Sequence, residues 1–294
     1  MSAKRILIVG CGKIGLRVAT LLSKSHHVWG LNRSIHSKGV QSVDSENTSH
    51  IQFITADVCK PESLNSQLPE HLDYIIYCIA PTERNEAAYR EVYLTGLKNV
   101  ISALPNPDFL KRLYFISSTS VYHQDDHSLV DETSATLPIS FSGRVLLEAE
   151  AYCNQLPISS TIIRFSGIYG ANRSRLIEQV NMHNAKLSAN TRLTNRIHED
   201  DCVGFILHLI QQNIQGNINE PVYLASDSEP VDLNEVIKFL AKILGHELTA
   251  ETSNDAEKRR AGNKKCSNQK MLDSGYQLHF PSYREGYLEM VEQS

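Results

Sequence analysis

Short apolar segments rich in β-branched residues alternate along the chain with longer segments whose apolar residues recur every three or four positions. The short segments predict strands and the longer ones predict helices. Strands are predicted at residues 5–9, 27–31, 51–55, 72–77, 112–117 and 160–165, and helices at residues 14–22, 62–68, 85–103 and 143–154. This alternation predicts an α/β fold of the Rossmann type, a doubly wound parallel sheet with helices on both faces.

The alternation weakens after about Gly170. Helices are predicted there at residues 201–212 and 233–244, the second closed by Gly245, and a strand at residues 222–225. We therefore predict a NAD(P)-binding Rossmann domain at residues 1–165 and a smaller substrate lobe at residues 166–294. The strand at residues 222–225 is predicted to return to the Rossmann sheet.

Three glycines, Gly10, Gly12 and Gly15, form the pattern Gly-x-Gly-x-x-Gly between the first predicted strand and the first predicted helix. In this context the first permits a tight turn, the second lets the backbone approach a pyrophosphate, and the third allows close helix–strand packing. The helix N-terminus, which includes Lys13 and Ile14, would face the phosphates with free N–H groups. The pattern predicts a dinucleotide site, the alternative being three turn glycines in an ordinary α/β protein.

Asn32 and Arg33 follow the second predicted strand, where NAD enzymes commonly carry an acidic residue that binds the ribose hydroxyls. An acid would repel a 2′-phosphate, whereas a guanidinium binds one in bidentate fashion. The sequence therefore favours NADP(H) over NAD(H) as the cofactor. The alternative for Arg33 is a solvated surface residue.

The composition narrows the function classes. A hydrophobic content of 41% and a charged content of 21% are ordinary for a globular protein, and a formal net charge of -4 argues against nucleic acid or an anionic membrane as partner. The first apolar run spans only residues 6–9, too short for a signal peptide or a membrane helix. The chain has no C-x-x-C pair, so we expect a reduced, cytoplasmic protein without a metal site; its cysteines are Cys11, Cys59, Cys78, Cys153, Cys202 and Cys266.

Four further motifs follow successive predicted strands. They are Ala56-Asp57-Val58, Cys78-Ile79-Ala80-Pro81, Ile116-Ser117-Ser118-Thr119-Ser120-Val121-Tyr122 and Arg164-Phe165-Ser166-Gly167-Ile168-Tyr169-Gly170. In these motifs the chain resembles the extended and atypical short-chain dehydrogenase/reductases, the NAD-dependent epimerase/dehydratase superfamily, and most of all its YeeZ-like subgroup. The likeness continues through residues 195–201 and 281–287, so it covers nearly the whole chain.

The resemblance implies roles for the residues of these motifs. Asp57 and Val58 would contact adenine, and Ser118 would orient a carbonyl or hydroxyl of the substrate. The second ribose and the rest of the cofactor site would be lined by Ile79, Ala80, Pro81, Ser117 and Ser166. The alternative for Ser118 is a hydroxyl that only caps or satisfies backbone groups.

Superfamily members that do redox chemistry use a Tyr-x-x-x-Lys pair on the helix after the fifth strand, where the lysine cation lowers the pKa of the tyrosine. Alignment on Glu150 puts Ser142 and Leu146 at these two positions, and none of the 12 tyrosines has a lysine four residues later. Either another group does the acid–base work, with Tyr122 and Tyr169 as candidates, or the chain is an NADP(H)-binding redox sensor or scaffold without catalysis. The alternative for both tyrosines is packing. We rank the enzyme first, because the second lobe resembles that of the family.

Two charged segments invite other interpretations. Residues 198–201, His-Glu-Asp-Asp, suggest a metal or acid–base site, but we prefer a helix cap in which Asp200 or Asp201 precedes a helix beginning near Cys202. Residues 258–260 with Lys264 and Lys265 form a basic cluster, which is either a solvated face or a site for an anionic substrate such as a sugar nucleotide or a phosphorylated metabolite. We expect a small-molecule substrate, and the sequence carries no signal for an oligomeric state.

Overall fold

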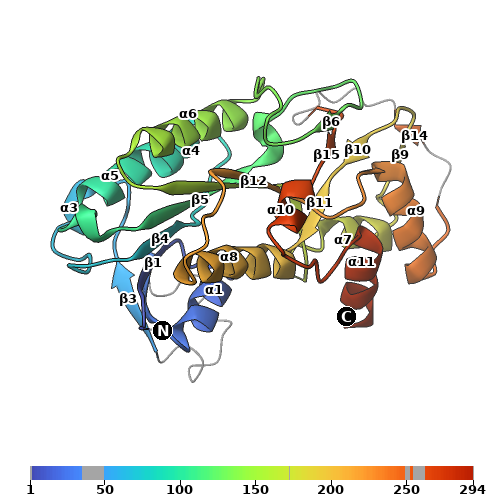
Figure 1. The fold of residues 1–294 in the computed structure, drawn as a ribbon. Helices are drawn as coiled ribbons and strands as arrows, with labels where there is room; N and C mark the ends of the chain where they lie inside the picture. Colours follow the sequence, from blue (N-terminus) through green and yellow to red (C-terminus); the bar gives the residue numbers. More distant parts are fainter. Residues whose placement is uncertain (1, 35–49, 172, 249–251, 254–261, 294) are drawn as a thin grey trace. The chain divides into compact units, whose positions relative to one another are not determined.

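The computed structural model describes residues 2–34, 50–171, 173–248, 252–253 and 262–293 (Figure 1). Contacts between Cα atoms divide the chain into two compact units. The first contains Met1–Ser118, Phe141–Ile163 and Ile206–Val222, and the second contains Thr119–Ser140, Arg164–Phe205 and Tyr223–Ser294. Each unit consists of three separate segments of the chain, whereas the sequence predicts a single domain boundary after residue 165. The predicted division into domains stays a prediction.

A seven-stranded parallel sheet with the order β12-β7-β5-β4-β1-β2-β3 is the centre of the fold (Figure 1). The chain runs from β1 outwards to β3 and then returns to β4 on the other side of β1, so the sheet is doubly wound and the predicted α/β Rossmann-type class is confirmed. The carboxyl ends of β1 and β4 flank the point where the strand order reverses. The strands are β1 (Arg5–Val9), β2 (His27–Asn32), β3 (Ile51–Thr55), β4 (Tyr74–Tyr77), β5 (Arg112–Ser118), β7 (Ser160–Phe165) and β12 (Val222–Ala225).

The inner strands are buried on both faces, as a parallel sheet covered by helices requires. The last four residues of β1 and all four residues of β4 are almost fully buried. The helical segments of the first unit are α1 (Lys13–Ser23), α3 (Pro61–Leu64), α4 (Glu86–Tyr89), the π-helix η2 (Arg90–Thr95), α5 (Gly96–Ser102), the 3₁₀ turn η3 (Pro107–Phe109) and α6 (Phe141–Gln155). The helix α8 (Glu199–Ile214) begins in the second unit and ends in the first.

Two predicted helices differ from those observed. The helix predicted at residues 62–68 ends at Leu64. The helix predicted at residues 85–103 contains a six-residue π-helix, where the hydroxyl of Tyr77 donates a hydrogen bond of 2.5 Å to the carbonyl of Val92. A side chain at Gly96 would meet that hydroxyl at 2.8 Å. The irregular turn is therefore fixed by a residue of β4, which the helical pattern of the segment does not show.

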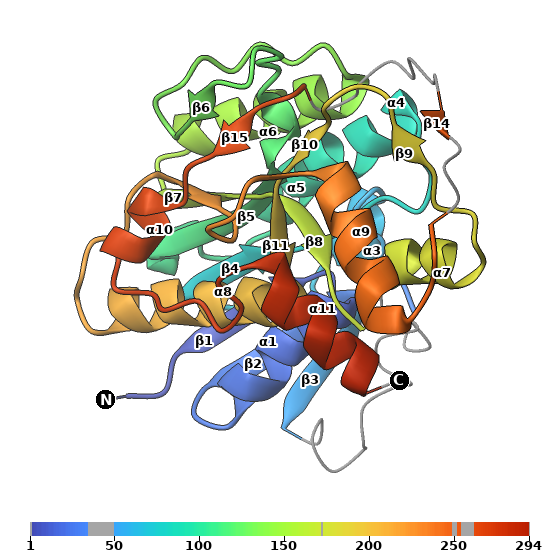
Figure 2. The same cartoon turned by 90° about the vertical axis from the view of Figure 1, so that its right-hand side faces the viewer.

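The second unit consists of short strands and helices (Figure 2). Its strands form the pairs β8–β11, β10–β13, β9–β14 and β6–β15. Its elements are η4 (Thr119–Val121), β6 (Leu129–Val130), β8 (Gly167–Tyr169), α7 (Arg175–Asn181), β9 (Leu187–Ser188), β10 (Leu193–Thr194), β11 (Arg196–His198), β13 (Val231–Asp232), α9 (Leu233–Leu244), β14 (Thr252–Ser253), β15 (Lys265–Cys266), α10 (Gln269–Asp273) and α11 (Tyr283–Glu292).

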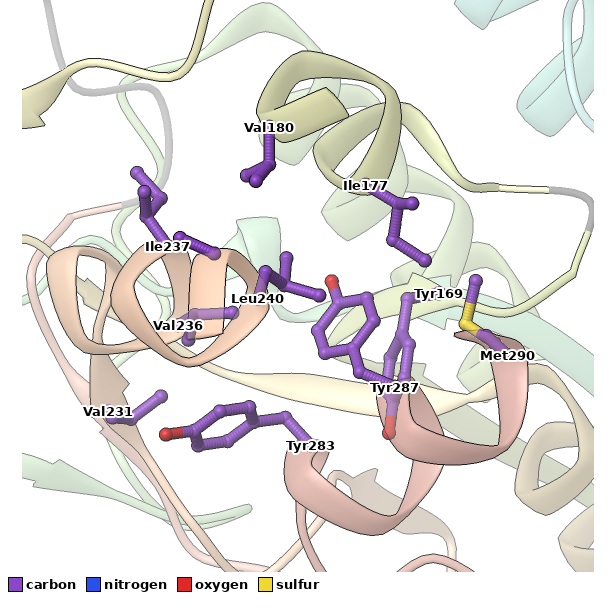
Figure 3. Close-up of a cluster of buried hydrophobic side chains, with 11 residues drawn as sticks. Tyr169, Ile177, Val180, Val231, Val236, Ile237, Leu240, Tyr283, Tyr287 and Met290 are labelled. Atoms are coloured by element: carbon purple, nitrogen blue, oxygen red, sulfur yellow. The ribbon is translucent and has the colours of Figure 1, made fainter. Parts of the chain in front are cut away.

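Side chains from α7, α9 and α11 enclose an apolar cluster in this unit (Figure 3). Tyr169 and Tyr287 lie beside each other within it, with ring centroids 4.7 Å apart. The predicted helix α9 has the bounds read from the sequence. Its N-cap residue Asp232 accepts a hydrogen bond from the N–H of Asn234, and Gly245 ends it with φ +72°. No helix in the described part of the chain combines the length and the apolar character that crossing a membrane requires.

The predicted cap at Asp200 or Asp201 is wrong, because α8 begins at Glu199 and both residues lie inside it. Asp201 is fully buried and binds another segment instead. Its carboxylate accepts hydrogen bonds from the hydroxyl of Tyr276 at 2.9 Å and from the N–H groups of His279 at 2.7 Å and Phe280 at 2.9 Å. Asp201 therefore fixes the chain that leads into α11.

Candidate functional site

The glycine loop between β1 and α1 lies against the end of β4. Gly10 has φ +94°, and its N–H donates to the carbonyl of Leu31 at 2.9 Å. A Cβ at this position would lie 2.6 Å from Cα of Ile79 and 2.7 Å from the carbonyl oxygen of Cys78. Both the backbone conformation and the close approach require glycine. The loop thus sits where the strand order reverses, the position at which open α/β sheets bind ligands.

Of the other two glycines, Gly15 allows close packing and Gly12 lies in open space. A Cβ at Gly15 would lie 2.1 Å from the carbonyl oxygen of Gly10, so the helix can approach the loop only with glycine there. At Gly12 no heavy atom of the described chain, apart from Gly12 and its two chain neighbours, lies within 4 Å of the position that a Cβ would take. Gly12 and Lys13 are exposed at the N-terminus of α1, whereas the side chain of Ile14 is buried. A helix N-terminus with free N–H groups is the kind of position that binds phosphate in other proteins.

Asn32, at the end of β2, braces the glycine loop. Its side-chain oxygen accepts a hydrogen bond of 2.8 Å from the N–H of Cys11, and its carbonyl accepts one of 3.0 Å from the N–H of Ala56. Arg33 follows on the surface. Burial and the nearby Asp57 carboxylate raise the pKa of the Cys59 thiol to about 11, and the Arg33 guanidinium opposes this rise. The charge of Arg33, after β2, is therefore felt by Cys59, after β3.

Asp57 and Val58 shape the turn after β3. The Asp57 carboxylate accepts a hydrogen bond of 3.0 Å from the N–H of Cys59, and its own N–H donates to the hydroxyl of Ser63 at 2.9 Å. The side chain of Val58 is buried beside Gly96. A contact between Val58 and adenine would therefore involve its backbone. Beyond β4, Ile79 and Pro81 are half-buried and Ala80 is exposed.

The two serines at the end of β5 differ in their surroundings. Ser117 is buried, and its hydroxyl donates a hydrogen bond of 2.6 Å to the carboxylate of Glu150, which is buried in α6. Ser118 is half-buried, and its side chain points to the opposite face because side chains alternate along a strand. Ser117 is thus tied to the helix, and Ser118 faces away from it.

The helix α6 carries the two positions aligned with the Tyr-x-x-x-Lys pair. Ser142 is half-buried and Leu146 is buried, and neither side chain carries a charge. The nearest cation along the helix, Arg144, is exposed and lies 3.9 Å from the carboxylate of Glu86. The helix therefore offers no cation that would lower the pKa of a hydroxyl at position 142.

Tyr122 lies between two buried cations in the second unit. It is 0% exposed, and its hydroxyl accepts a hydrogen bond of 2.6 Å from the guanidinium of Arg164. Its carbonyl accepts one of 3.1 Å from the amine of Lys264, which is 2% exposed. Burial lowers the pKa of that amine.

For Lys264 the interpretation as part of a solvated basic face is therefore wrong. Lys264 directly precedes β15, which pairs with β6 from Lys265 onwards, and Lys264 is buried whereas Lys265 is exposed. The remaining basic residues of the predicted cluster, 258–260, lie outside the described residues.

Tyr169 is packed into the apolar cluster of the second unit (Figure 3). Its hydroxyl donates to the carbonyl of Ser282 at 3.4 Å, and a side chain at Gly286 would meet that hydroxyl at 2.1 Å. Burial raises the pKa of Tyr169. His198 is buried against it and against Phe280, and burial lowers the pKa of the imidazole.

Ser166, a predicted cofactor residue, belongs to the second unit and is buried. Its N–H donates to the carbonyl of Ala225 at 3.0 Å. Its hydroxyl has no hydrogen-bond partner among the described residues.

The second unit contains a pocket of about 330 Å³ that the sequence interpretation missed, and we name it the arginine pocket. Three arginines line it, Arg173, Arg175 and Arg196, and none of its described lining residues is acidic. The other lining residues are Gly167, Ile168, Tyr169, Leu176, Gln179, Thr194, Asn195, Leu233 and Tyr287. Such a lining suits an anionic ligand, because guanidinium groups bind phosphate and carboxylate in bidentate fashion. In the sequence, this pocket could have been suspected from Arg173 and Arg175, which closely follow Gly170.

Comparisons with known proteins agree with this architecture. The sequence profile of the NAD dependent epimerase/dehydratase family matches residues 6–225. Protein YeeZ of Escherichia coli K12 is 28% identical over 224 residues, which cover 73% of this chain and 76% of that protein.

Two solved structures are similar over almost their full length. A protein of Methylobacillus flagellatus described as a NAD-dependent epimerase/dehydratase is 36% identical with a TM-score of 0.82, and 99% of each chain is covered. The UDP-glucose 4-epimerase of Thermotoga maritima, solved with UDP-glucose, shares the fold at 17% identity with a TM-score of 0.77, over 98% of this chain and 97% of that chain. The profile match and the first of these structures show that this chain belongs to the NAD-dependent epimerase/dehydratase family.

Proposed function

We propose that this protein is an NADP(H)-binding enzyme, an oxidoreductase or an epimerase-like enzyme that acts on an anionic small molecule. The observation that carries the proposal is the edge of the dinucleotide site. The close packing at Gly10 and Gly15 supports a loop that holds a pyrophosphate, and the adjoining end of β2 carries neutral Asn32 and cationic Arg33 in place of an acidic residue. A 2′-phosphate would meet attraction there, where an acid would repel it.

When bound, NADP(H) supplies the hydride donor or acceptor for such chemistry. The residues of the chain would hold it: the N–H groups of the glycine loop on the pyrophosphate, and Arg33 on the 2′-phosphate. Ser118 is the residue that we propose to orient the reacting oxygen of the substrate. The buried, hydrogen-bonded hydroxyls of Tyr122 and Tyr169 support packing roles for these two tyrosines over acid–base roles.

The arginine pocket supports an anionic substrate. Three arginines line it and none of its described lining residues is acidic, which favours a ligand that carries phosphate or carboxylate groups. Solved structures of the same fold include a UDP-glucuronic acid 4-epimerase in complex with UDP-glucuronic acid and NAD. A sugar nucleotide or a phosphorylated metabolite is therefore the substrate class that we propose.

A second candidate is a redox sensor or scaffold that binds NADP(H) without turnover. Ser142 and Leu146, at the positions of the Tyr-x-x-x-Lys pair, favour it because neither can take or hold a substrate proton unaided. Such a protein would bind the cofactor as tightly as the enzyme would, so binding alone does not separate the two.

The test begins with calorimetric titration of nucleotide-free protein with NADPH and NADH in parallel. Selective NADPH binding is expected, and equal affinity or a preference for NADH would overturn the cofactor assignment. Sugar nucleotides and phosphorylated carbonyl compounds are then screened for a change in NADPH absorbance and, by NMR, for isomerisation. Turnover of either kind supports the enzyme, whereas tight NADPH binding without turnover across the panel supports the sensor.

A further inference from the structure

The backbone of Arg196, in the arginine pocket, is fixed by the two residues that follow β12. The N–H of Asp227 donates a hydrogen bond of 2.6 Å to the carbonyl of Arg196, and the hydroxyl of Ser226 donates one of 3.1 Å to the same oxygen. The side-chain amide of Asn268 holds this segment in turn, through the carbonyl of Ser226 at 3.0 Å. Asp227 and Arg196 are therefore held next to each other.

The side chain of Asp227 is 1% exposed but poorly bonded. One carboxyl oxygen accepts a long hydrogen bond of 3.3 Å from the N–H of Glu229, and Oδ2 has no partner among the described residues. No ion pair joins Asp227 to Arg196 in the described chain, and the Arg196 guanidinium donates to the hydroxyl of Thr194 instead. A buried carboxylate with an unbonded oxygen is costly, so this environment favours the neutral carboxyl.

The charged groups around Asp227 shift the pKa of its carboxyl in opposite directions. Burial raises the pKa of its carboxyl to about 8; the Arg196 guanidinium opposes that rise, and Glu229 and Asp201 add to it. Burial raises the pKa of Tyr169 and of the Cys266 thiol, and Asp227 adds to both rises. Among the described groups named here as acting on the Asp227 pKa, Arg196 is the cation; it lines the pocket, and its carbonyl is bonded to the N–H of Asp227.

We propose that Asp227 sets the charge of the arginine pocket: as a neutral carboxyl it leaves the Arg196 guanidinium to an anionic ligand, and as a carboxylate it adds a negative charge near that guanidinium and weakens ligand binding. This inference rests on the proposed anion-binding role of the pocket. The protonated form exists below about pH 8, so anion affinity is constant there and falls at higher pH. An anion that binds above that pH draws a proton onto Asp227.

The test is calorimetric titration of the full chain with UDP-glucose, whose phosphodiester charges do not change in this range, between pH 6.5 and pH 9. Wild-type protein is expected to bind about tenfold more weakly at pH 9 than at pH 7, because each pH unit above the pKa costs a factor of ten. Asp227→Asn, which mimics the neutral carboxyl, should hold the wild-type affinity of pH 7 across the whole range. Glu235→Gln, the matched control on an exposed carboxyl of α9 that is not among the groups acting on Asp227, should keep the wild-type pH dependence.

Proton uptake gives a measurement that needs no variant. Titrations of wild-type protein at pH 8 in two buffers of different ionisation enthalpy should show uptake of about half a proton per ligand bound. If UDP-glucose binds at pH 7 but no proton is taken up at pH 8, or the affinity at pH 9 is unchanged, the proposed role of Asp227 is wrong. The proposed anion binding by the pocket would still hold in that case. Absence of binding at pH 7 overturns the pocket itself, and with it this inference.

Discussion

The side-chain oxygen of Asn32 accepts a hydrogen bond from the backbone N–H of Cys11 at 2.8 Å. A second bond, from the N–H of Gly10 to the carbonyl of Leu31, runs beside it at 2.9 Å. The end of β2 is therefore joined to the glycine loop by one backbone bond and one side-chain bond. An aspartate at position 32 could accept the same N–H, so the amide differs from the acid in charge and not in shape.

The substitution Asn32→Asp is expected to separate these two properties. It keeps an acceptor for Cys11 and adds a negative charge near Arg33, so NADPH affinity should fall at least tenfold relative to NADH affinity, or about 1.4 kcal/mol. Asn32→Ala removes the acceptor and should weaken both nucleotides alike. Calorimetry with the two nucleotides measures the ratio, and a parallel loss for both in Asn32→Asp would contradict a role of charge.

Arg33→Asp tests the 2′-phosphate contact directly. Loss of a bidentate guanidinium and gain of a repulsive carboxylate should weaken NADPH by about 100-fold and NADH by less than threefold, since charge-assisted hydrogen bonds contribute roughly 1.5–3 kcal/mol each. Lys60→Asp serves as the control, because Lys60 is an exposed cation just beyond the β3 turn. Equal losses of NADPH and NADH in the Arg33 variant would remove the 2′-phosphate assignment.

The parts of the fold that the sequence predicted are those fixed by local chemistry. The helix α9 carries its own signals, the cap Asp232 and the terminal Gly245, and the observed bounds agree with them. The glycine loop is likewise recognisable because its turn needs glycine at fixed spacing. The π-helix η2 depends on the Tyr77 hydroxyl, a contact from another element that no local pattern encodes.

The site was predicted less completely for the same reason. Lys264 looks like part of a charged surface run, yet its amine is buried and donates to the carbonyl of Tyr122. The arginine pocket collects Arg173 and Arg175 from α7 and its approach, and Arg196 from β11, so its charge becomes visible only when these segments meet. From the sequence, residues 258–260 with Lys264 and Lys265 were either a solvated face or an anion site, because these basic residues lie close together in the chain.

Ser117→Ala should destabilise the protein. The Ser117 hydroxyl donates to a Glu150 oxygen at 2.6 Å, and its removal takes one hydrogen bond from that buried carboxylate, at a cost of about 1–3 kcal/mol. Denaturant unfolding of Ser117→Ala beside Ser118→Ala measures the difference, with little change expected for the half-buried Ser118. Equal stability of Ser117→Ala and wild type would show that the bond contributes nothing net.

Ser118→Ala should affect turnover and not nucleotide binding. If Ser118 orients the substrate oxygen, loss of its hydroxyl should lower kcat/KM by about 10²-fold while the Kd for NADPH stays within twofold. Ser118→Thr, which keeps a hydroxyl, should recover part of the rate. A large loss of NADPH affinity in Ser118→Ala would make the residue a cofactor ligand instead.

Asp227→Asn should make the protein more stable at pH 8 than wild type. The pKa of the Asp227 carboxyl is raised to about 8 from the ordinary value of 3.8, so the folded state binds a proton that the unfolded state has released. Its favourable contribution is complete below pH 3.8 and is lost as the pH rises through about 8, which leaves a penalty at neutral pH that asparagine does not carry. The difference in Tm between variant and wild type should therefore grow from pH 5 to pH 8. A wild type that gains stability over this range relative to Asp227→Asn would mean that the carboxyl is ionised and paired in the folded protein.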